Sequence, residues 1–330
     1  MKYYIINKAN WEKNLKGLTG KYLVYASVNN GNTQDYQILS PSNITEISYN
    51  TAKPVTPLKS LFLPVRENVS SLPEGDKPRI IIGVPNCDVE AIRILDEIYL
   101  DDAFEDIFYR YRRENTLIIS TDCFIIQEHC HCTAYGIRPF AEKNADISVI
   151  LYNGSVILRE ISAKGADLIN KLEGVDLLND TDIETYIDKK RREVEVLLDS
   201  SNTGLPGYQA TGKLVENASM DVWRKHSVRC VSCGACTTIC PTCSCFLLID
   251  KPGFHKVKQM DACQYPGFER VAGGEDALHE LALRFMNRYK CKYVWKPERF
   301  KSLACTGCGR CIEACIGRIN KNEIFRELAK

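Results

Sequence analysis

The chain has 330 residues, among them 43 basic and 42 acidic side chains and sixteen cysteines. This length allows two domains with a sizeable core, and the balanced charge provides no global field that would favour nucleic acid or an acidic membrane surface. The sequence contains no segment long and apolar enough for a membrane span or a signal peptide, so we expect a cytoplasmic protein. So many cysteines in a reducing compartment indicate metal binding rather than disulfides.

Residues 1–199 are predicted to form an α/β domain, because predicted strands and helices alternate along them. A β-α-β unit opens the chain, and residues 29–58 are predicted to form a polar loop broken by prolines. Two compact apolar runs predict buried strands, each followed by a loop that contains cysteine. The expected strands are residues 3–7, 21–28, 77–84, 117–120, 147–151 and 155–161, and the expected helices are 10–18, 89–100, 163–172 and 180–198.

Residues 200–218 are small, polar and rich in glycine, which predicts a linker. Part of this segment, Gly207 to Lys213, has the spacing of a phosphate-binding loop, but Leu214 stands where such a loop needs a Ser or Thr for magnesium. We therefore expect no nucleotide there. Residues 219–330 are predicted to form a mostly helical, ferredoxin-like domain, with helices at 220–228, 274–289 and 320–328.

Two cysteine runs in this last domain have the pattern C-x2-C-x2-C-x3-C. A tight loop of this spacing supplies three ligands to a [4Fe-4S] cluster, and the last cysteine of each run ligates the cluster of the other run. Zinc sites instead pair C-x2-C hooks, often with histidine, and leave a third cysteine at the same pitch unused. We predict one cluster on Cys230, Cys233, Cys236 and Cys315, and a second on Cys305, Cys308, Cys311 and Cys240.

Further thiols lie beyond the first run. Cys243 and Cys245 follow it in the sequence C-P-T-C-x-C, and Cys263 comes later. They are candidate ligands of another metal or thiol site, and the alternative is that they are buried small side chains. Cys291 is predicted to be structural.

The α/β domain has its own cysteine set. Parallel strands end on the same edge of a sheet, so if the strands at 77–84 and 117–120 are neighbours, the loops after them converge. A third cluster is therefore a hypothesis, with structural zinc or packed thiols as alternatives. Its ligands would be Cys87, Cys123, Cys130 and Cys132.

Charged residues near the ligands have two interpretations. Arg229, Arg310 and Arg318 flank cluster cysteines and would either raise a cluster's potential or form ordinary surface charge. His129 and His131 are either substitute ligands or solvated loop residues.

Several segments together resemble a known family, the iron–sulfur β subunits of soluble nickel–iron (sulf)hydrogenases and the related iron–sulfur subunit of anaerobic sulfite reductase. The resemblance extends from about residue 55 to residue 320. This chain has Pro85-Asn86 where the family usually has Arg-Pro, and His131 where the family usually has an aromatic residue. The matching segments are Arg79–Asp88, Tyr109–Arg113, Glu128–Cys132, Cys236–Phe246 and Cys305–Cys311.

The resemblance implies an electron-transfer subunit rather than a catalytic one. In such complexes a flavin subunit oxidises NAD(P)H, the β-type subunit passes single electrons through its clusters, and another subunit performs the chemistry. The expected partners are therefore a flavin- and NAD(P)-binding subunit and a catalytic oxidoreductase subunit. Two alternatives are a reductase with its own open site around Cys243, Cys245 and Cys263, and a structural adaptor that docks through its α/β domain.

Overall fold

The computed structural model describes residues 2–31, 33–71 and 77–330, and the N-terminal region contains an eight-stranded mixed sheet. The strand order is β3-β2-β5-β6-β7-β8-β1-β9, and β2, β5, β6 and β7 run parallel. The α/β character predicted for this region is confirmed. The strands are β1 Tyr3–Asn7, β2 Leu23–Asn30, β3 Thr33–Ile38, β5 Arg79–Pro85, β6 Thr116–Thr121, β7 Ile147–Tyr152, β8 Ser155–Glu160 and β9 Val175–Leu177.

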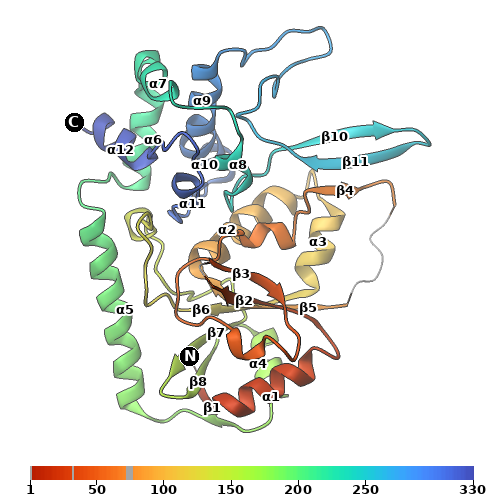
Figure 1. The fold of residues 1–330 in the computed structure, drawn as a ribbon, viewed down its shortest axis with the longest axis vertical. Helices are drawn as coiled ribbons and strands as arrows, with labels where there is room; N and C mark the ends of the chain where they lie inside the picture. Colours follow the sequence, from red (N-terminus) through yellow and green to blue (C-terminus); the bar gives the residue numbers. More distant parts are fainter. Residues whose placement is uncertain (1, 32, 72–76) are drawn as a thin grey trace.

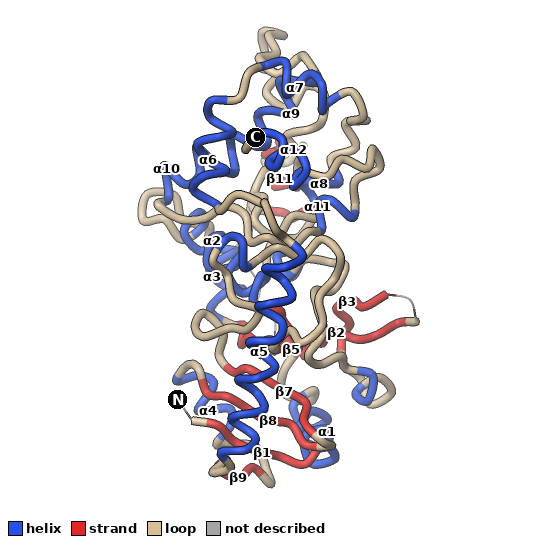
Figure 2. The backbone as a smooth tube through the Cα atoms, turned by 90° about the vertical axis from the view of Figure 1, so that its left-hand side faces the viewer, coloured by secondary structure: helices blue, strands red, loops and turns tan. Residues whose placement is uncertain are grey.

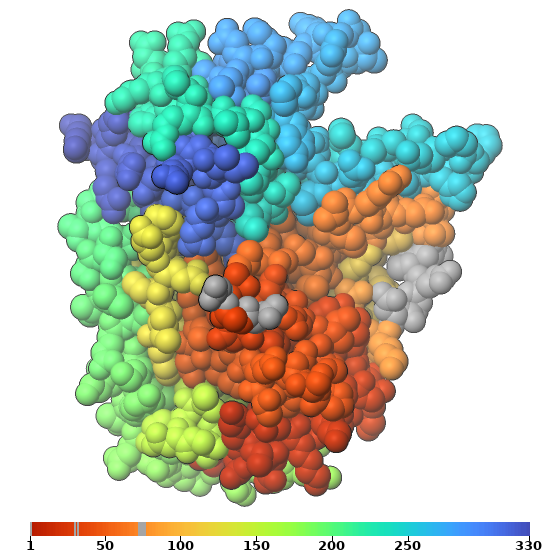
Figure 3. All heavy atoms as spheres, viewed as in Figure 1, coloured from red at the N-terminus to blue at the C-terminus, as the bar shows by residue number. Residues whose placement is uncertain are grey.

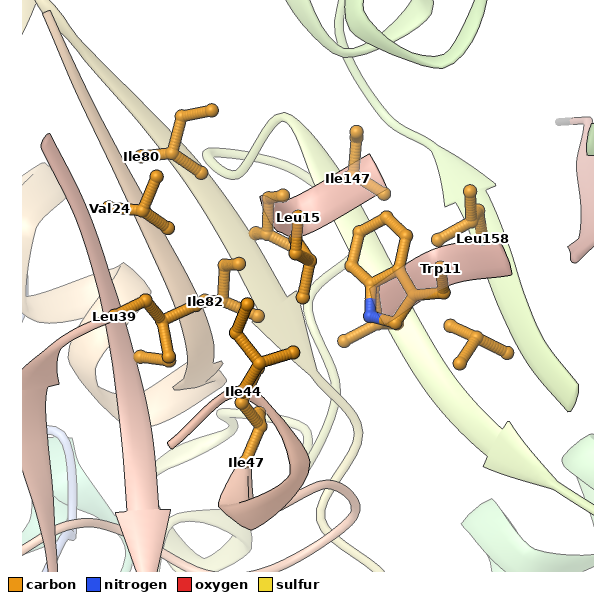
Figure 4. Close-up of a cluster of buried hydrophobic side chains, with 14 of the residues drawn as sticks. Trp11, Leu15, Val24, Leu39, Ile44, Ile47, Ile80, Ile82, Ile147 and Leu158 are labelled. Atoms are coloured by element: carbon orange, nitrogen blue, oxygen red, sulfur yellow. The ribbon is translucent and has the colours of Figure 1, made fainter. Parts of the chain in front are cut away.

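Helices cover both faces of this sheet because the central strands carry apolar side chains on both sides. On one face Trp11 and Leu15 of α1 belong to a buried cluster with strand residues such as Ile82, Ile147 and Leu158 (Figure 4). On the other face α2 and α3 pack against Ile81, and α5 packs nearby. The helices of this region are α1 Lys8–Leu18, α2 Asn86–Tyr99, α3 Ile107–Glu114, α4 Ala163–Ile169 and α5 Thr181–Ser201, with 3-10 turns η1 Ile44–Glu46, η2 Leu58–Leu61 and η3 Thr133–Tyr135.

The long helix α5 runs along the side of the molecule and connects the α/β region to the C-terminal region (Figure 2). The C-terminal region is built around an aromatic core that includes Tyr208, Trp223, Tyr289 and Phe325. Its helices are α6 Tyr208–Asn217, α7 Met220–Ser227, α8 Ala235–Thr238, α9 Leu281–Lys290, α10 Lys296–Phe300, α11 Arg310–Glu313 and α12 Lys321–Leu328, and the π-helical turn η4 Cys291–Trp295 joins α9 to α10.

A β-hairpin interrupts the helices of the C-terminal region. Strands β10 Phe246–Lys251 and β11 His255–Met260 pair with each other, and β4 Arg66–Asn68 of the N-terminal region pairs with β11. The hairpin projects from the body of the molecule (Figures 1 and 3). The sequence prediction placed no hairpin in this insertion, so the hairpin corrects the mostly helical description.

The structure differs from the sequence prediction in four further places. Residues 200–218 contain helix α6, whose Tyr208, Thr211 and Val215 are buried, so the predicted linker is largely a packed helix. Helix α9 begins at Leu281 rather than near residue 274. The predicted loop at 29–58 contains β3, which pairs with β2. Strand β1 lies between β8 and β9 rather than beside β2.

None of the helices in the described residues is long and apolar enough to cross a membrane.

Candidate iron–sulfur centres

The first cysteine run forms a tight loop that ends in the short helix α8. Gly234 precedes this helix in the left-handed region with φ +71°, and a Cβ there would lie 2.9 Å from the Cβ of Ala262 and would overlap the ring of Tyr265. Only glycine fits such a position without strain. The loop therefore lies flat against the segment around Tyr265.

Cysteines of both runs line a common cavity. Its volume is about 40 Å³, whereas one water needs roughly 10–15 Å³ by the same measure. The chain segment after Cys315 lies directly against the segment before Cys230, since a Cβ on Gly317 would overlap the carbonyl oxygen of Arg229. This first cavity thus brings together the four cysteines predicted for the first cluster and one more, namely Cys230, Cys233, Cys236, Cys315 and Cys311.

The second run is held against the cysteine loop of the α/β region. Gly307 has φ +68°, and a Cβ there would lie 2.6 Å from the carbonyl oxygen of His131 and 2.7 Å from Cys132 Cα. The His131 N–H donates to the Gly307 carbonyl over 2.8 Å. Two cysteine loops more than 150 residues apart in the sequence, around positions 131 and 307, therefore share one interface.

The predicted ligands of the second cluster are mostly buried, and they influence one another electrostatically. Burial raises the pKa of Cys308 to about 12, Arg310 opposes this shift, and the neighbouring Cys240 and Cys311 add to it. Cys305 and Cys240 both lie close enough to Lys292 to raise its pKa. A thiol whose pKa is raised, as that of Cys308 is, gives up its proton when a metal binds, which couples metal binding to proton release.

The cysteines of the α/β region converge because the condition set by the sequence hypothesis, that the two strands before them are neighbours, is met. Strands β5 and β6 are parallel neighbours, Cys87 lies in the first turn of α2 directly after β5, and Cys123 follows β6. Their loops meet the loop of residues 130–132 around a second cavity of about 30 Å³. The thiols that line this cavity are Cys87, Cys123, Cys130, Cys132 and, from the second run, Cys308.

The cysteine thiols are arranged for a cluster inside each cavity rather than for a single metal ion. Over residues 2–31, 33–71 and 77–330, no three His, Cys, Asp or Glu side chains come close enough together to hold a single metal ion. The thiols are instead distributed around the walls of the two cavities.

Four buried cationic side chains near the cysteines indicate that the thiol sites suit a negatively charged group. Each is at most 4% exposed, and within the described part of the chain their polar contacts are carbonyl, hydroxyl, amide and imidazole groups rather than carboxylates. An unpaired buried charge costs several kcal/mol, so a counterion is required. The available counterions are cysteine thiolates, which a [4Fe-4S] cluster would hold in their charged form. The four cations are Lys59, Arg288, Lys292 and Lys321. Burial lowers the pKa of Lys59, whereas in the other three the nearby cysteines outweigh burial and the pKa is raised.

Arg288 and Lys321 line the first cavity. Burial would lower the pKa of Arg288, but Cys236 and Cys311 raise it well above its usual value. One guanidinium N–H of Arg288 donates to the Cys236 carbonyl over 3.3 Å, while its Nε has no hydrogen-bond partner. No local motif in the sequence marks these cations, because each acquires its role only when distant cysteines fold around it.

His131 is not the solvated loop residue that was one of its two interpretations. It is fully buried, and its Nε2 lies 2.8 Å from Lys321 Nζ while Nδ1 lies 2.7 Å from the His129 carbonyl. A lysine ammonium can only donate, so Nε2 accepts and Nδ1 carries the proton. His131 therefore connects the cysteine loop of the α/β region to α12.

The flanking arginines differ in their surroundings. Arg229 and Arg318 are exposed, as surface charge would be. Arg310 is buried between two ligands and pairs with Asp88 through both carboxylate oxygens, at 2.6 and 2.7 Å.

The extra thiols of the C-terminal region form two contact pairs. Cys243 donates to the sulfur of Cys240, and Cys245 donates to the sulfur of Cys263. Cys291 lies near Cys245 in the π-helical turn.

Comparison with known proteins agrees with this geometry. Residues 229–319 match the family model described as "4Fe-4S dicluster domain". The two cysteine runs, the two thiol-lined cavities and this family match together identify an iron–sulfur protein of the electron-transfer class. More particularly, the chain is 28% identical to "Sulfhydrogenase 2 subunit beta" of Pyrococcus furiosus over 318 residues, which cover 92% of each chain. The resemblance to hydrogenase β subunits that the cysteine motifs predicted is therefore confirmed.

Proposed function

We propose that this chain is the electron-transfer subunit of a cytoplasmic multi-subunit oxidoreductase. It would pass single electrons between a flavin- and NAD(P)H-binding subunit and a catalytic subunit of the hydrogenase or sulfite-reductase type. Support comes from the dicluster domain and from the likeness, along nearly the whole chain, to a protein named as the β subunit of a sulfhydrogenase.

The proposed ligands of the two C-terminal clusters are the crossed sets. Cys230, Cys233 and Cys236 would share the first cluster with Cys315, which is supported by their common cavity and by the close approach of Gly317 to Arg229. Cys240 would join Cys305, Cys308 and Cys311 on the second cluster, with the Cys243 thiol donating to the Cys240 sulfur. Hydrogen bonds to ligand sulfurs are one of the means by which a protein sets a cluster's potential.

We further propose a third cluster in the second cavity, which the four cysteines of the α/β region line. One observation supports electron transfer through all three sites. Two proposed ligands of the second cluster line two different cavities. Cys311 lines the first cavity, and Cys308 lines the second cavity. With this ligand assignment the second cluster would lie between the other two sites, and the three sites would form a continuous series.

One end of this series reaches the surface. Cys233 is exposed, and the exposed apolar residues Val228, Val231 and Ile316 lie next to the first-cluster ligands in the sequence. Exposed apolar residues around a redox site suit contact with a partner protein. We propose that electrons enter or leave the chain here.

A bound [4Fe-4S] cluster supplies one-electron chemistry while its four cysteines remain in place. The protein contributes burial and fixed charge. Lys59, Arg288, Lys292 and Lys321 favour the more negative, reduced form and so would raise the potentials of the nearby sites.

Anaerobic purification, followed by iron and sulfide analysis and by a one-electron redox titration, tests the proposal. Three cubanes predict about twelve irons per chain, and two predict about eight. Cys233→Ala should remove the first cluster and disturb the second, because the two runs share ligands. A colourless protein, or zinc in place of iron, would contradict the relay, and about eight irons would contradict the third site alone.

A further inference from the structure

Cys245 and Cys263 belong to none of the three proposed ligand sets, and their side chains contact each other. The Asp261 N–H donates to the Cys245 carbonyl over 3.0 Å, and Phe246 pairs with Met260 at the base of the hairpin. This pairing brings Cys263 back beside Cys245, whose thiol donates to the Cys263 sulfur.

The surroundings of Cys263 favour a thiolate. Cys263 is buried, Thr237 Oγ1 lies 3.5 Å from its sulfur, and Gln264 Nε2 donates to it over 3.7 Å. Gln264 is itself fixed by a 2.7 Å hydrogen bond to the Arg284 carbonyl. The hydrogen bond from Cys245 lowers the pKa of Cys263 to about 6, while the pKa of Cys245 is raised. One thiol that stabilises the thiolate of another is typical of reactive dithiols.

The pair differs from the ligands of the first set in its position. Those ligands line the first cavity, whereas Cys245 and Cys263 line neither the first nor the second cavity. Their thiols are near neighbours, and joining two neighbouring sulfurs in a disulfide requires no other group of the chain. The pair also lies next to the first cluster site, since Thr237 follows the ligand Cys236 directly in the chain.

We propose that Cys245 and Cys263 form a dithiol–disulfide couple in redox contact with the first cluster site. From this thiol–thiolate pair, oxidation would form the Cys245–Cys263 S–S bond, break the S–H bond of Cys245 and release one proton and two electrons. The two one-electron centres of the dicluster domain are the acceptors, so this inference rests on the proposed function. The reverse step uses two electrons and one proton to restore the Cys245 thiol and the Cys263 thiolate. The couple would thereby connect the clusters, which each transfer one electron, to a group that gains or loses two electrons.

Thiol trapping at controlled redox poise tests the couple. The full chain with its clusters is equilibrated in buffers of varied reduced-to-oxidised glutathione ratio, quenched in acid, alkylated and digested for mass spectrometry. We expect the fraction of a disulfide-linked peptide containing Cys245 and Cys263 to increase as the buffers become more oxidising, from absent in the most reducing buffer to predominant in the most oxidising one. Cys245→Ser and Cys263→Ser should abolish it with iron content unchanged, and Cys291→Ser should leave it intact.

A coulometric titration through mediators tests the contact with the clusters. The oxidised wild-type chain should take up two more electrons than Cys263→Ser at equal iron content, since a disulfide is a two-electron couple. Equal uptake, free thiols at every poise, or a Cys245–Cys291 link would overturn the proposal. Loss of about four irons in Cys263→Ser would also overturn it, because Cys263 would then be a ligand. A wild-type chain without iron would instead show that the proposed function fails.

Discussion

Arg310, which lies between the second-cluster cysteines Cys308 and Cys311, forms a two-point ion pair with Asp88 beside Cys87. Both side chains are almost completely buried, at 2% and 0% exposure. The pair therefore connects the second cluster run to the third cysteine set through one pair of opposite charges.

Asp88→Asn should destabilise the chain strongly, because it leaves the Arg310 charge buried without its partner. Breaking a buried ion pair costs about 3–5 kcal/mol in free energy of unfolding. Anaerobic denaturant titration measures the change. The matched control is Glu173→Gln, which removes the exposed ion pair with Lys13 and should cost at most about 1 kcal/mol. Similar losses for the two variants would show that the Asp88 pair carries little stability.

Gly307→Ala should weaken the contact between the two cysteine loops. A new Cβ would collide with backbone atoms of His131 and Cys132 in addition to straining a left-handed residue. Gly204→Ala is the control, because Gly204 has φ +74° with nothing within 4 Å of its Cβ position. The control should lose only the backbone strain, about 1 kcal/mol. Thermal unfolding and iron content should show a larger loss for Gly307→Ala, and equal losses would contradict the close approach.

Cys123→Ser should lower the iron content from about twelve to about eight per chain if the third site holds a cubane. The electron paramagnetic resonance signals of the other two clusters should persist, because Cys123 lines the second cavity and belongs to neither C-terminal ligand set. Cys291→Ser provides the control, since Cys291 lies outside all three ligand sets, and it should keep every iron.

Lys321→Met should lower the reduction potential of at least one C-terminal cluster. Lys321 is fully buried, and its charge lies near Cys305 and Cys311, so its removal disfavours the more negative reduced form. A decrease of tens of millivolts is expected, given that about 59 mV corresponds to a tenfold change for one electron. Potentiometric titration provides the measurement. Lys225→Met, at an exposed lysine, should leave the potentials unchanged, and an unchanged potential in Lys321→Met would refute the role of the buried charge.

Removal of iron should destabilise the chain beyond the loss of the ligand bonds, because the buried cations would lose their counterions. Lys292→Met removes one such cation and should narrow the difference in free energy of unfolding between loaded and iron-free protein. Lys225→Met should leave this difference as it is in the wild type. A difference that stays constant in Lys292→Met would mean that the thiolates do not compensate this charge.

The sequence predicts best where spacing alone decides the structure. The two runs of cysteines indicate clusters because three ligands lie within one loop. The convergence of the loops after β5 and β6 followed from the sequence only on the condition that the two strands are neighbours, because parallel strands end on one edge of a sheet. The sequence did not predict the hairpin, since Phe246 to Ile249 is an apolar run without the alternation of a half-buried strand. Arg288 and Lys321 could not be found as cluster neighbours, because their surroundings come from segments far apart in the chain. The linker prediction failed for a similar reason: α6 is stabilised by burial of Tyr208 and Val215 rather than by local propensity.

The projecting hairpin begins immediately after Cys245 and ends three residues before Cys263. Its edge strand β10 exposes Phe246, Leu247 and Leu248, and Phe254 at the tip is fully exposed. The backbone that carries these side chains is continuous with both thiols at the base. The two strands that carry this exposed apolar surface therefore lead directly to the two thiols, and a partner protein seated on the arm would lie on the segment that ends at Cys245 and Cys263.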